Sequence, residues 1–346
     1  MGKPPQRTSL EDVARLAGVS PSTVSRALNR PELVSPATRE RILEIARSLG
    51  YTPDQVARSL KRGKSRTLGL ILSDISVSFH ADVARGVEEV AQAQGYSLIL
   101  FHSQESPERE RAGLELLKSY RVAGIILEPT GKNRELEEAL VQEGIRVVEV
   151  DRISGAKGVP SVLSDNLQGA ALAAEHLLQA GHRWAFVVGG ELGLTSCGER
   201  TEAFARRFTA GGGAAEVYTC PSTPEGGYEA ALRYLSRGQR PSAVFVTTGQ
   251  MAQGVLQAFQ EQGIAIPQEV SLVVFDDPPW ASLVSPPLTA VRQQAQEIGR
   301  KAAQRVLGER FPGRPKILRL PTELVERASV ARLADPGGSY PPDNPA

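Results

Sequence analysis

Short apolar runs alternate with amphipathic stretches from Thr67 onward, and this alternation limits the possible folds more than any other feature. Such runs have the length and composition of buried strands. They cover residues 68–72, 97–101, 124–127, 146–150, 184–188, 243–246 and 271–275. Helical periodicity lies between them at residues 81–94, 108–119, 167–180, 199–209, 226–236 and 251–262. The pattern predicts an α/β fold with mainly parallel sheets.

The α/β part, residues 67–334, is longer than a domain built on one open sheet usually is, so we expect two lobes. A break at residues 160–165 predicts the first crossing between the lobes. A second crossing is expected near residues 276–287. The Pro- and Gly-rich residues 335–346 are typical of a disordered tail.

Residues 1–52 have the pattern of three short helices. Apolar side chains recur at helical spacing from Leu10 to Ala17, after the possible cap Ser9. A Gly-containing break precedes a second helix that starts at Pro21, where a missing N–H costs nothing. A third helix follows Ser35 and ends at Gly50. Two short helices joined by a tight turn predict a helix-turn-helix.

The charge of the chain is uneven, although its net charge is only +1. Residues 1–66 contain 13 Lys and Arg against 6 Asp and Glu, whereas the remaining residues contain 27 against 33. A basic head on a mildly acidic body suits a polyanion partner that is held through its phosphates. Residues 53–66 combine a marginal helix with a polar run, so we interpret them as a hinge helix and linker that fold only against a partner.

The stretch LEDVARLAGVSPSTVSRALN, residues 10–29, closely resembles the DNA-binding head of the LacI/GalR family. The likeness continues through residues 34–35, 38–41, 49–53 and 56–60 and reaches residues 324–327 near the end. It implies an N-terminal all-α helix-turn-helix head and an α/β two-lobed, periplasmic-binding-protein-like sensor domain. It also implies a cytoplasmic repressor of transcription that binds a pseudo-palindromic operator in double-stranded DNA as a homodimer, under the control of a small-molecule effector.

In such a head the second helix enters the major groove, where its first residues meet base edges. The predicted DNA-binding residues fall into three groups. The base-edge group is Pro21, Ser22, Thr23 and Arg26; the phosphate group is Ser20, Ser25, Asn29 and Tyr51; the hinge group is Ala57, Leu60 and Lys61. Arg26 can pair with guanine through two hydrogen bonds, so it is the best candidate for base discrimination. Leu60 matches the leucine with which family members wedge open the minor groove.

The sensor site should lie where parallel strands end, because open α/β sheets bind ligands at their carboxyl edges. By resemblance the predicted effector-binding residues are Phe79, His80, Asp151, Ser196, Arg200, Thr248, Asp276 and Gln293. A carboxylate opposite a guanidinium suits a sugar. The carboxylate accepts hydrogen bonds from the sugar hydroxyls, and the guanidinium donates hydrogen bonds to their oxygens.

Two departures from the family pattern limit this ligand assignment. Thr247 and Thr248 replace the Asn-Asp pair often seen in relatives, and Ser222 stands near the place where purine-sensing and some sugar-sensing relatives have an aromatic. We expect a sugar or sugar derivative, with a nucleobase as the less favoured alternative.

Other classes of protein fit the sequence less well. A periplasmic sugar-binding protein would need an export signal and no basic head, whereas residues 1–6 lead directly into a polar helix start. An enzyme on an α/β fold would need a motif that we do not find, since Gly-x-Gly-x-x-Gly, Walker and Gly-x-Ser-x-Gly patterns are missing. Cys197 and Cys220 are expected to be reduced thiols. We therefore predict no catalytic residue, cofactor, metal site or membrane span.

Overall fold

The computed structural model describes residues 8–51, 65–308 and 316–333. The chain divides into two compact units, Met1–Ser65 and Arg66–Ala346, which we describe separately as the head and the sensor domain. Of the predicted hinge, residues 53–66, only Ser65 and Arg66 belong to the described residues. The predicted tail lies outside them.

The head consists of α1 (Leu10–Ala17), α2 (Pro21–Asn29), the 3-10 turn η1 (Pro31–Leu33) and α3 (Pro36–Ser48). A capping box holds the start of α1, because Ser9 and Asp12 each accept a hydrogen bond from the other's backbone N–H. Gly18 ends this helix in the left-handed region, at φ 62°, which favours glycine and permits the tight turn into α2. The three helices enclose a small core of Val13, Ala14, Ala17, Val24, Ala27, Ile42 and Ala46.

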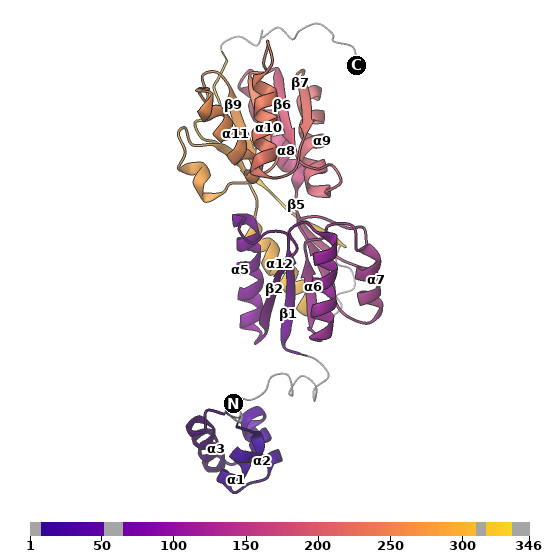
Figure 1. Ribbon diagram of the computed structural model, residues 1–346, viewed down its shortest axis with the longest axis vertical. Helices are drawn as coiled ribbons and strands as arrows, with labels where there is room; N and C mark the ends of the chain where they lie inside the picture. Colours follow the sequence, from indigo (N-terminus) through magenta and orange to yellow (C-terminus); the bar gives the residue numbers. More distant parts are fainter. Residues whose placement is uncertain (1–7, 52–64, 309–315, 334–346) are drawn as a thin grey trace, which may run out of the picture. The chain divides into compact units, whose positions relative to one another are not determined.

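The sensor domain is built on two six-stranded sheets (Figure 1). The first sheet has the order β11-β5-β4-β3-β1-β2, and its strands pair in parallel. Its strands are β1 (Thr67–Leu72), β2 (Ser97–His102), β3 (Gly124–Leu127), β4 (Val147–Val150), β5 (Ser161–Ser164) and β11 (Ile317–Leu320). We call this sheet with its helices the first lobe.

The second lobe contains the sheet β12-β10-β9-β8-β6-β7, in which only the β10–β12 pair is antiparallel. Its strands are β6 (Trp184–Gly189), β7 (Ala214–Thr219), β8 (Ala243–Val246), β9 (Ser271–Phe275), β10 (Thr289–Arg292) and β12 (Glu323–Val325). A 3-10 turn, η2 (Pro279–Ser282), packs against this lobe through the buried Ala281.

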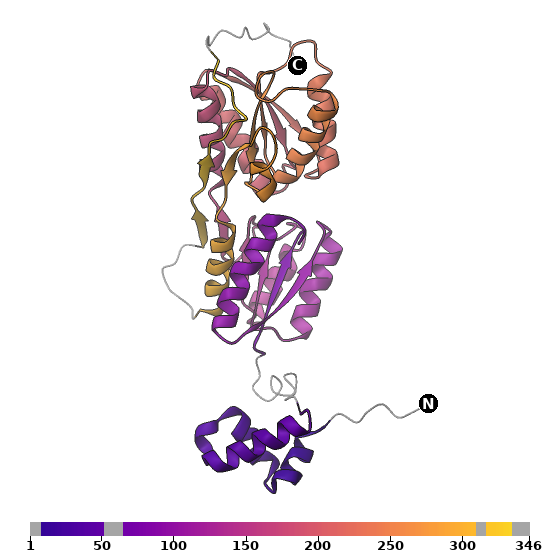
Figure 2. The same ribbon diagram turned by 90° about the vertical axis from the view of Figure 1, so that its left-hand side faces the viewer.

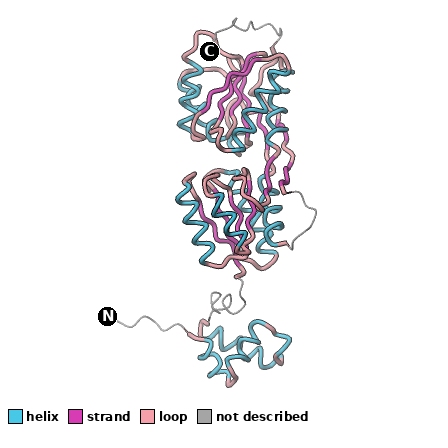
Figure 3. The backbone as a smooth tube through the Cα atoms, turned by 90° about the vertical axis from the view of Figure 1, so that its right-hand side faces the viewer, coloured by secondary structure: helices cyan, strands magenta, loops and turns pink. Residues whose placement is uncertain are grey.

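Helices cover both faces of each sheet (Figure 3). On the first lobe, α5 (Ser78–Ala93) and α12 (Ala295–Leu307) pack on one face, and α6 (Pro107–Ser119) and α7 (Arg134–Gln142) on the other. On the second, α8 (Asn166–Gln179) and α9 (Thr195–Ala210) lie opposite α10 (Pro224–Leu235) and α11 (Gly249–Glu261). Burial on both faces explains why the strands are continuously apolar. None of the described helices has the length and apolar character needed to cross a membrane.

The chain passes between the lobes three times. It first crosses after β5, at Asp165, within the region that the sequence predicts. The predicted second crossing, near residues 276–287, is wrong: Ala281 and Leu288 belong to the core of the second lobe, and the chain crosses only between β10 and α12. A third crossing joins β11 to β12, as the gold segment in Figure 2 shows. The sequence analysis also did not identify α7, α12 or the strands β5, β7, β10, β11 and β12.

Candidate functional site

The start of α2 presents the residues that are predicted to meet DNA bases. Ser20 caps this helix by accepting a hydrogen bond from the backbone N–H of Thr23, at 3.2 Å. Its hydroxyl also lies 2.7 Å from that of Ser22 and 2.9 Å from that of Thr23. Pro21, Ser22 and Arg26 are exposed, and Thr23 is half-buried. The exposed surface of α2 therefore carries hydroxyl groups at its start and the guanidinium of Arg26 in its last turn.

The remaining predicted DNA contacts are placed less uniformly. Ser25 is half-buried on α2, and Tyr51 is half-buried against the core of the head. The side chain of Asn29 is not described, and Ala57, Leu60 and Lys61 lie outside the described residues. Ser20, which is predicted to contact phosphate, also has the structural role of helix cap.

A cavity of about 440 Å³ lies between the two lobes of the sensor domain. All eight residues predicted to bind the effector line it: Phe79, His80, Asp151, Ser196, Arg200, Thr248, Asp276 and Gln293. The wall is formed mainly by residues that follow the carboxyl ends of strands, since β1, β2, β3 and β4 lead into it from one lobe and β6, β7, β8 and β9 from the other. This is the position at which open α/β sheets hold ligands. We call this cavity the cleft.

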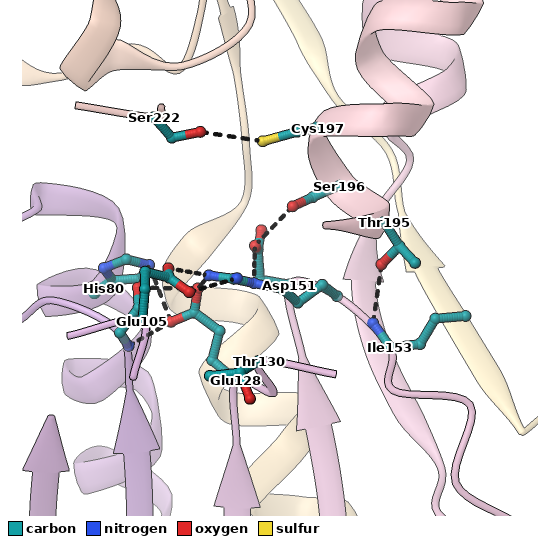
Figure 4. A network of polar contacts seen from close by, with 12 residues as sticks. His80, Glu105, Glu128, Thr130, Asp151, Ile153, Thr195, Ser196, Cys197 and Ser222 are labelled. Atoms are coloured by element: carbon teal, nitrogen blue, oxygen red, sulfur yellow. Dashed lines mark hydrogen bonds and ion pairs between the residues drawn. The ribbon is translucent and has the colours of Figure 1, made fainter. Parts of the chain in front are cut away.

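Asp151 joins the two lobes across the cleft. It follows β4, and its carboxylate accepts a hydrogen bond from Ser196 Oγ of the second lobe at 3.1 Å (Figure 4). Arg200 Nη2 lies 3.5 Å from the other carboxylate oxygen. Burial raises the pKa of Asp151, and the neighbouring Arg200 opposes that rise. A ligand that replaces Ser196 or Arg200 as a partner of Asp151 therefore changes a contact between the two lobes.

Arg200 is held from several sides in the second lobe. Its Nε donates to Asn166 Oδ1 at 2.9 Å, and Nη1 donates to the carbonyl oxygen of Thr247 at 3.1 Å. The guanidinium carbon stands 4.1 Å from the centre of the Phe275 ring, which is the geometry of a cation–π contact. Its side chain is 4% exposed, so its position is fixed before any ligand enters.

Asp276 and Gln293 form a second polar group on the wall. The carboxylate of Asp276 accepts from the backbone N–H of Gly249 at 2.9 Å and from the amide of Gln293. Thr248 caps α11 by accepting from the backbone N–H of Met251 at 3.3 Å. Gln293 stands directly at the crossing from β10 to α12, so a ligand that contacts it also contacts a connection between the lobes.

The sequence analysis missed a charged network on the first-lobe side of the cleft. Glu128, which follows β3, is 1% exposed and accepts from Ser73 N at 2.7 Å. His80 Nε2 lies 3.2 Å from Glu128, and Arg152 also pairs with this carboxylate. Burial alone would lower the pKa of His80, yet the Glu128 carboxylate and its other partners raise it to about 9. The imidazole is therefore a cation at neutral pH.

Glu128 directly follows β3, and Arg152 is the second residue after β4, so the rule that located Asp151 could have located them too. Arg152 pairs with Glu105 through two hydrogen bonds of 2.9 and 2.7 Å. Figure 4 shows Glu105, Glu128 and His80 gathered beside Asp151.

Backbone strain is concentrated at the cleft. Among the described residues, five other than glycine adopt a positive φ, and four of them line this cavity: Gln104 at 53°, Glu105 at 56°, Asp151 at 62° and Asp276 at 85°. Each such residue costs about 1–3 kcal/mol and persists only where its surroundings hold it. The fold thus maintains three carboxylates in unfavourable conformations around one cavity.

A helix-turn-helix head and a two-lobed domain with a polar cleft together define a class of protein, the ligand-controlled transcription regulators. Residues 9–54 match the family model "Bacterial regulatory proteins, lacI family", and residues 174–330 match the model "Periplasmic binding protein-like domain". The HTH-type transcriptional repressor PurR of Vibrio atlanticus is 32% identical over 335 residues, which covers 94% of this chain and 99% of the relative. PurR of Haemophilus influenzae is 32% identical over 340 residues, with the same coverage.

Solved structures of LacI-family regulators are also similar to this chain. The lac repressor dimer bound to operator and the anti-inducer ONPF is 25% identical, with a TM-score of 0.82 over 94% of this chain and all of that chain. A complex of the transcriptional regulator CelR with cellobiose is 28% identical, with a TM-score of 0.70 over 93% of this chain and all of that one. The chain belongs to the LacI family of bacterial regulatory proteins: it is a DNA-binding regulator controlled by a small-molecule effector.

Proposed function

We propose that this protein is a homodimeric repressor whose grip on a pseudo-palindromic operator is set by a sugar or sugar derivative in the cleft. One observation carries the proposal: the eight residues predicted from sequence line a single cavity between the lobes of a domain attached to a helix-turn-helix head. The function is one of binding, with no covalent chemistry, and it is exercised in the cytoplasm, where the operator is.

The cleft wall supports a polyhydroxylated ligand. The carboxylates of Asp151 and Asp276 can accept from hydroxyl groups, and Ser196 and Gln293 can donate or accept. Phe79 offers a ring for the C–H face of a sugar. A nucleobase remains the second candidate, with Phe79 as the one phenyl ring among the lining residues. Ser222 stands near the place where purine-sensing and some sugar-sensing relatives have an aromatic, so this position does not separate the two kinds of ligand. The polar side chains of the lining nevertheless favour the sugar.

On DNA, we propose that two heads occupy the two half-sites and that the hinges of both subunits pair in the minor groove. The symmetry of such an operator would mirror the symmetry of the dimer. Arg26 would read a base, while Ser20, Ser25, Asn29 and Tyr51 would hold phosphates. A ligand that favours one angle between the lobes shifts operator binding only as far as its affinities for the two states differ.

Selection of genomic fragments by the purified protein tests the function. We expect a small set of fragments with a two-fold symmetric sequence to survive competition with random duplex, and sedimentation to show one dimer for each fragment. Sedimentation of a monomer on such a fragment would contradict the proposal, as would equal retention of all fragments.

A further inference from the structure

The cleft carries more negative than positive charge, and this imbalance bears on what can bind there. Six carboxylates line it, from Asp74, Glu105, Glu128, Asp151, Glu191 and Asp276. Three cations line it, from His80, Arg152 and Arg200. The net charge of the lining residues is therefore negative, which disfavours the binding of an anion.

The cations of the wall are also occupied by partners inside the protein. Both terminal nitrogens of Arg152 donate to Glu105, and one of them also pairs with Glu128; its Nε makes no hydrogen bond but lies 3.6 Å from an oxygen of Asp151. His80 Nδ1 lies 2.6 Å from the carbonyl oxygen of Asp74, and Nε2 faces Glu128. Neither cation of the first lobe has a free pair of donors that could hold a phosphate.

Arg200 is engaged in the same way. Its three donor nitrogens face Asn166 and Thr247 of its own lobe, and Gln293 and Asp151 beside the cleft. The flat side of the guanidinium covers Phe275. A phosphate or carboxylate ligand would have to separate one of these cations from a partner. Where that partner is Glu128 or Asp151, it would leave a buried carboxylate without compensation, which is costly.

We propose, on the basis of the function proposed above, that the cleft selects an effector without an anionic group and rejects phosphorylated forms of the same molecule. The carboxylates supply both the affinity and the selection: they accept from hydroxyl or ammonium groups and repel phosphate. In this chain the effector is thus an uncharged or cationic polyol, and a sugar phosphate does not act through the cleft.

Removal of one carboxylate should create the anion site that the wild-type protein lacks. Glu105 is the suitable residue, because its side chain is 46% exposed and it holds Arg152 from the cleft side. The full-length protein and its Glu105→Gln variant are titrated with inorganic phosphate and, separately, with ribose 5-phosphate, at constant ionic strength. We expect no detectable binding in the cleft of the wild-type protein over the titrated range. Glu105→Gln should bind with a Kd at least about tenfold below the wild-type detection limit, because one opposing charge has been removed.

Two further variants locate the effect. Glu143→Gln removes an exposed glutamate that pairs with Lys118 at 2.6 Å, away from the cleft, and should behave as the wild type. Arg152→Gln in the Glu105→Gln background should abolish the gain. The proposal is overturned if the wild-type protein binds either anion and Arg152→Gln removes that binding, or if Glu105→Gln gains nothing. These results do not depend on DNA, so they are independent of the operator experiment above.

Discussion

At the scale of single residues, the proposed reading of the operator sequence depends most on Arg26. It is exposed in the last turn of α2. Arg26→Ala should relax base preference at one position in each half-site by about 1–3 kcal/mol, because a bidentate pair with guanine is lost. Competition gel shifts with single-base operator variants measure this. Arg15→Ala, which removes an exposed arginine of α1 paired with Asp12, is the control. An equal loss for all operator variants would refute the role of Arg26.

Asp276 and Asp277 are neighbours with different expected roles. Asp276 lines the cleft, whereas Asp277 pairs with Arg292 at 2.7 Å and with Arg327 at 2.8 Å. In a thermal-shift screen of neutral sugars, amino sugars and nucleobases, a ligand at 100 times its Kd should add about 2.7 kcal/mol to the stability of the wild type.

The Asp276→Asn variant should lose that gain and keep its operator affinity. Asp277→Asn should keep the ligand response and unfold at a lower temperature than wild type. If Asp276→Asn responds to the ligand normally, Asp276 does not belong to the site.

Glu137 of α7 should make the stability of the sensor domain fall as the pH becomes alkaline. It is fully buried, its Oε2 accepts from Ser154 Oγ at 3.2 Å, and burial together with the nearby carboxylate of Glu149 raises its pKa to about 9. The neutral form is therefore the one that the folded state prefers. Stability from this group is complete below the ordinary pKa of 4.5 and is lost as the pH rises through about 9.

Denaturant unfolding at about pH 7 and about pH 10 measures this loss, which accumulates at about 1.4 kcal/mol for each pH unit between the ordinary and the folded pKa and levels off above about pH 9. Glu137→Gln is neutral and of the same shape, so it should lose less stability over that interval than the wild type. His80, with a pKa of about 9, contributes loss of the same sign in both proteins. Equal losses in the two proteins would show that Glu137 is ionised already at neutral pH.

At the scale of elements, the closest helix packing in the first lobe lies between α5 and α12. A Cβ on Gly299 would stand 2.1 Å from the carbonyl oxygen of Val83, and a Cβ on Gly86 would stand 2.0 Å from that of Gln296. Gly299→Ala should therefore destabilise the protein by about 1–3 kcal/mol, against the usual gain from alanine in a helix. Gly238→Ala, where the space is open, is the control. An unchanged midpoint of denaturant unfolding for Gly299→Ala would contradict the close contact.

The hinge is the element that links cleft and head in the proposed mechanism, and its prediction rests on the family resemblance of residues 56–60. If Leu60 wedges into the minor groove, Leu60→Ala should reduce operator bending more than it reduces nonspecific binding, because the wedge unstacks a base step. Circular-permutation gel shifts measure the bend. An unchanged bend angle would remove the wedge from the account.

Local sequence patterns predicted the buried central strands and most of the helices, but not the strands that stand next to the crossings between the lobes. β5, β10, β11 and β12 are short, and the crossing beside Gln293 depends on which sheet a strand joins, which is a long-range choice. Likewise, Glu110 and Glu137 read as ordinary polar positions of helices, although both are buried. Glu128 and Arg152 could have been found, since each follows a strand, as Asp151 does.

At the scale of the whole molecule, the three crossings make the cleft an effective place to control the protein. The crossing residue Gln293 contacts Ser164 beside another crossing, and Arg319 of β11 pairs with Glu199 of α9 through hydrogen bonds of 2.9 and 2.5 Å. A ligand that closes or opens the cleft must therefore act on the connections that join the two lobes. The coupling free energy this yields is limited by the difference between the ligand's affinities for the two states.

The most direct measurement is operator affinity, by fluorescence anisotropy, as a function of the concentration of a ligand that binds the cleft. The account predicts that this ligand changes the operator Kd by at least about fivefold in the wild-type protein, in the usual range of allosteric coupling, and leaves Asp276→Asn unchanged. An operator Kd that stays constant while the ligand saturates the cleft would contradict it.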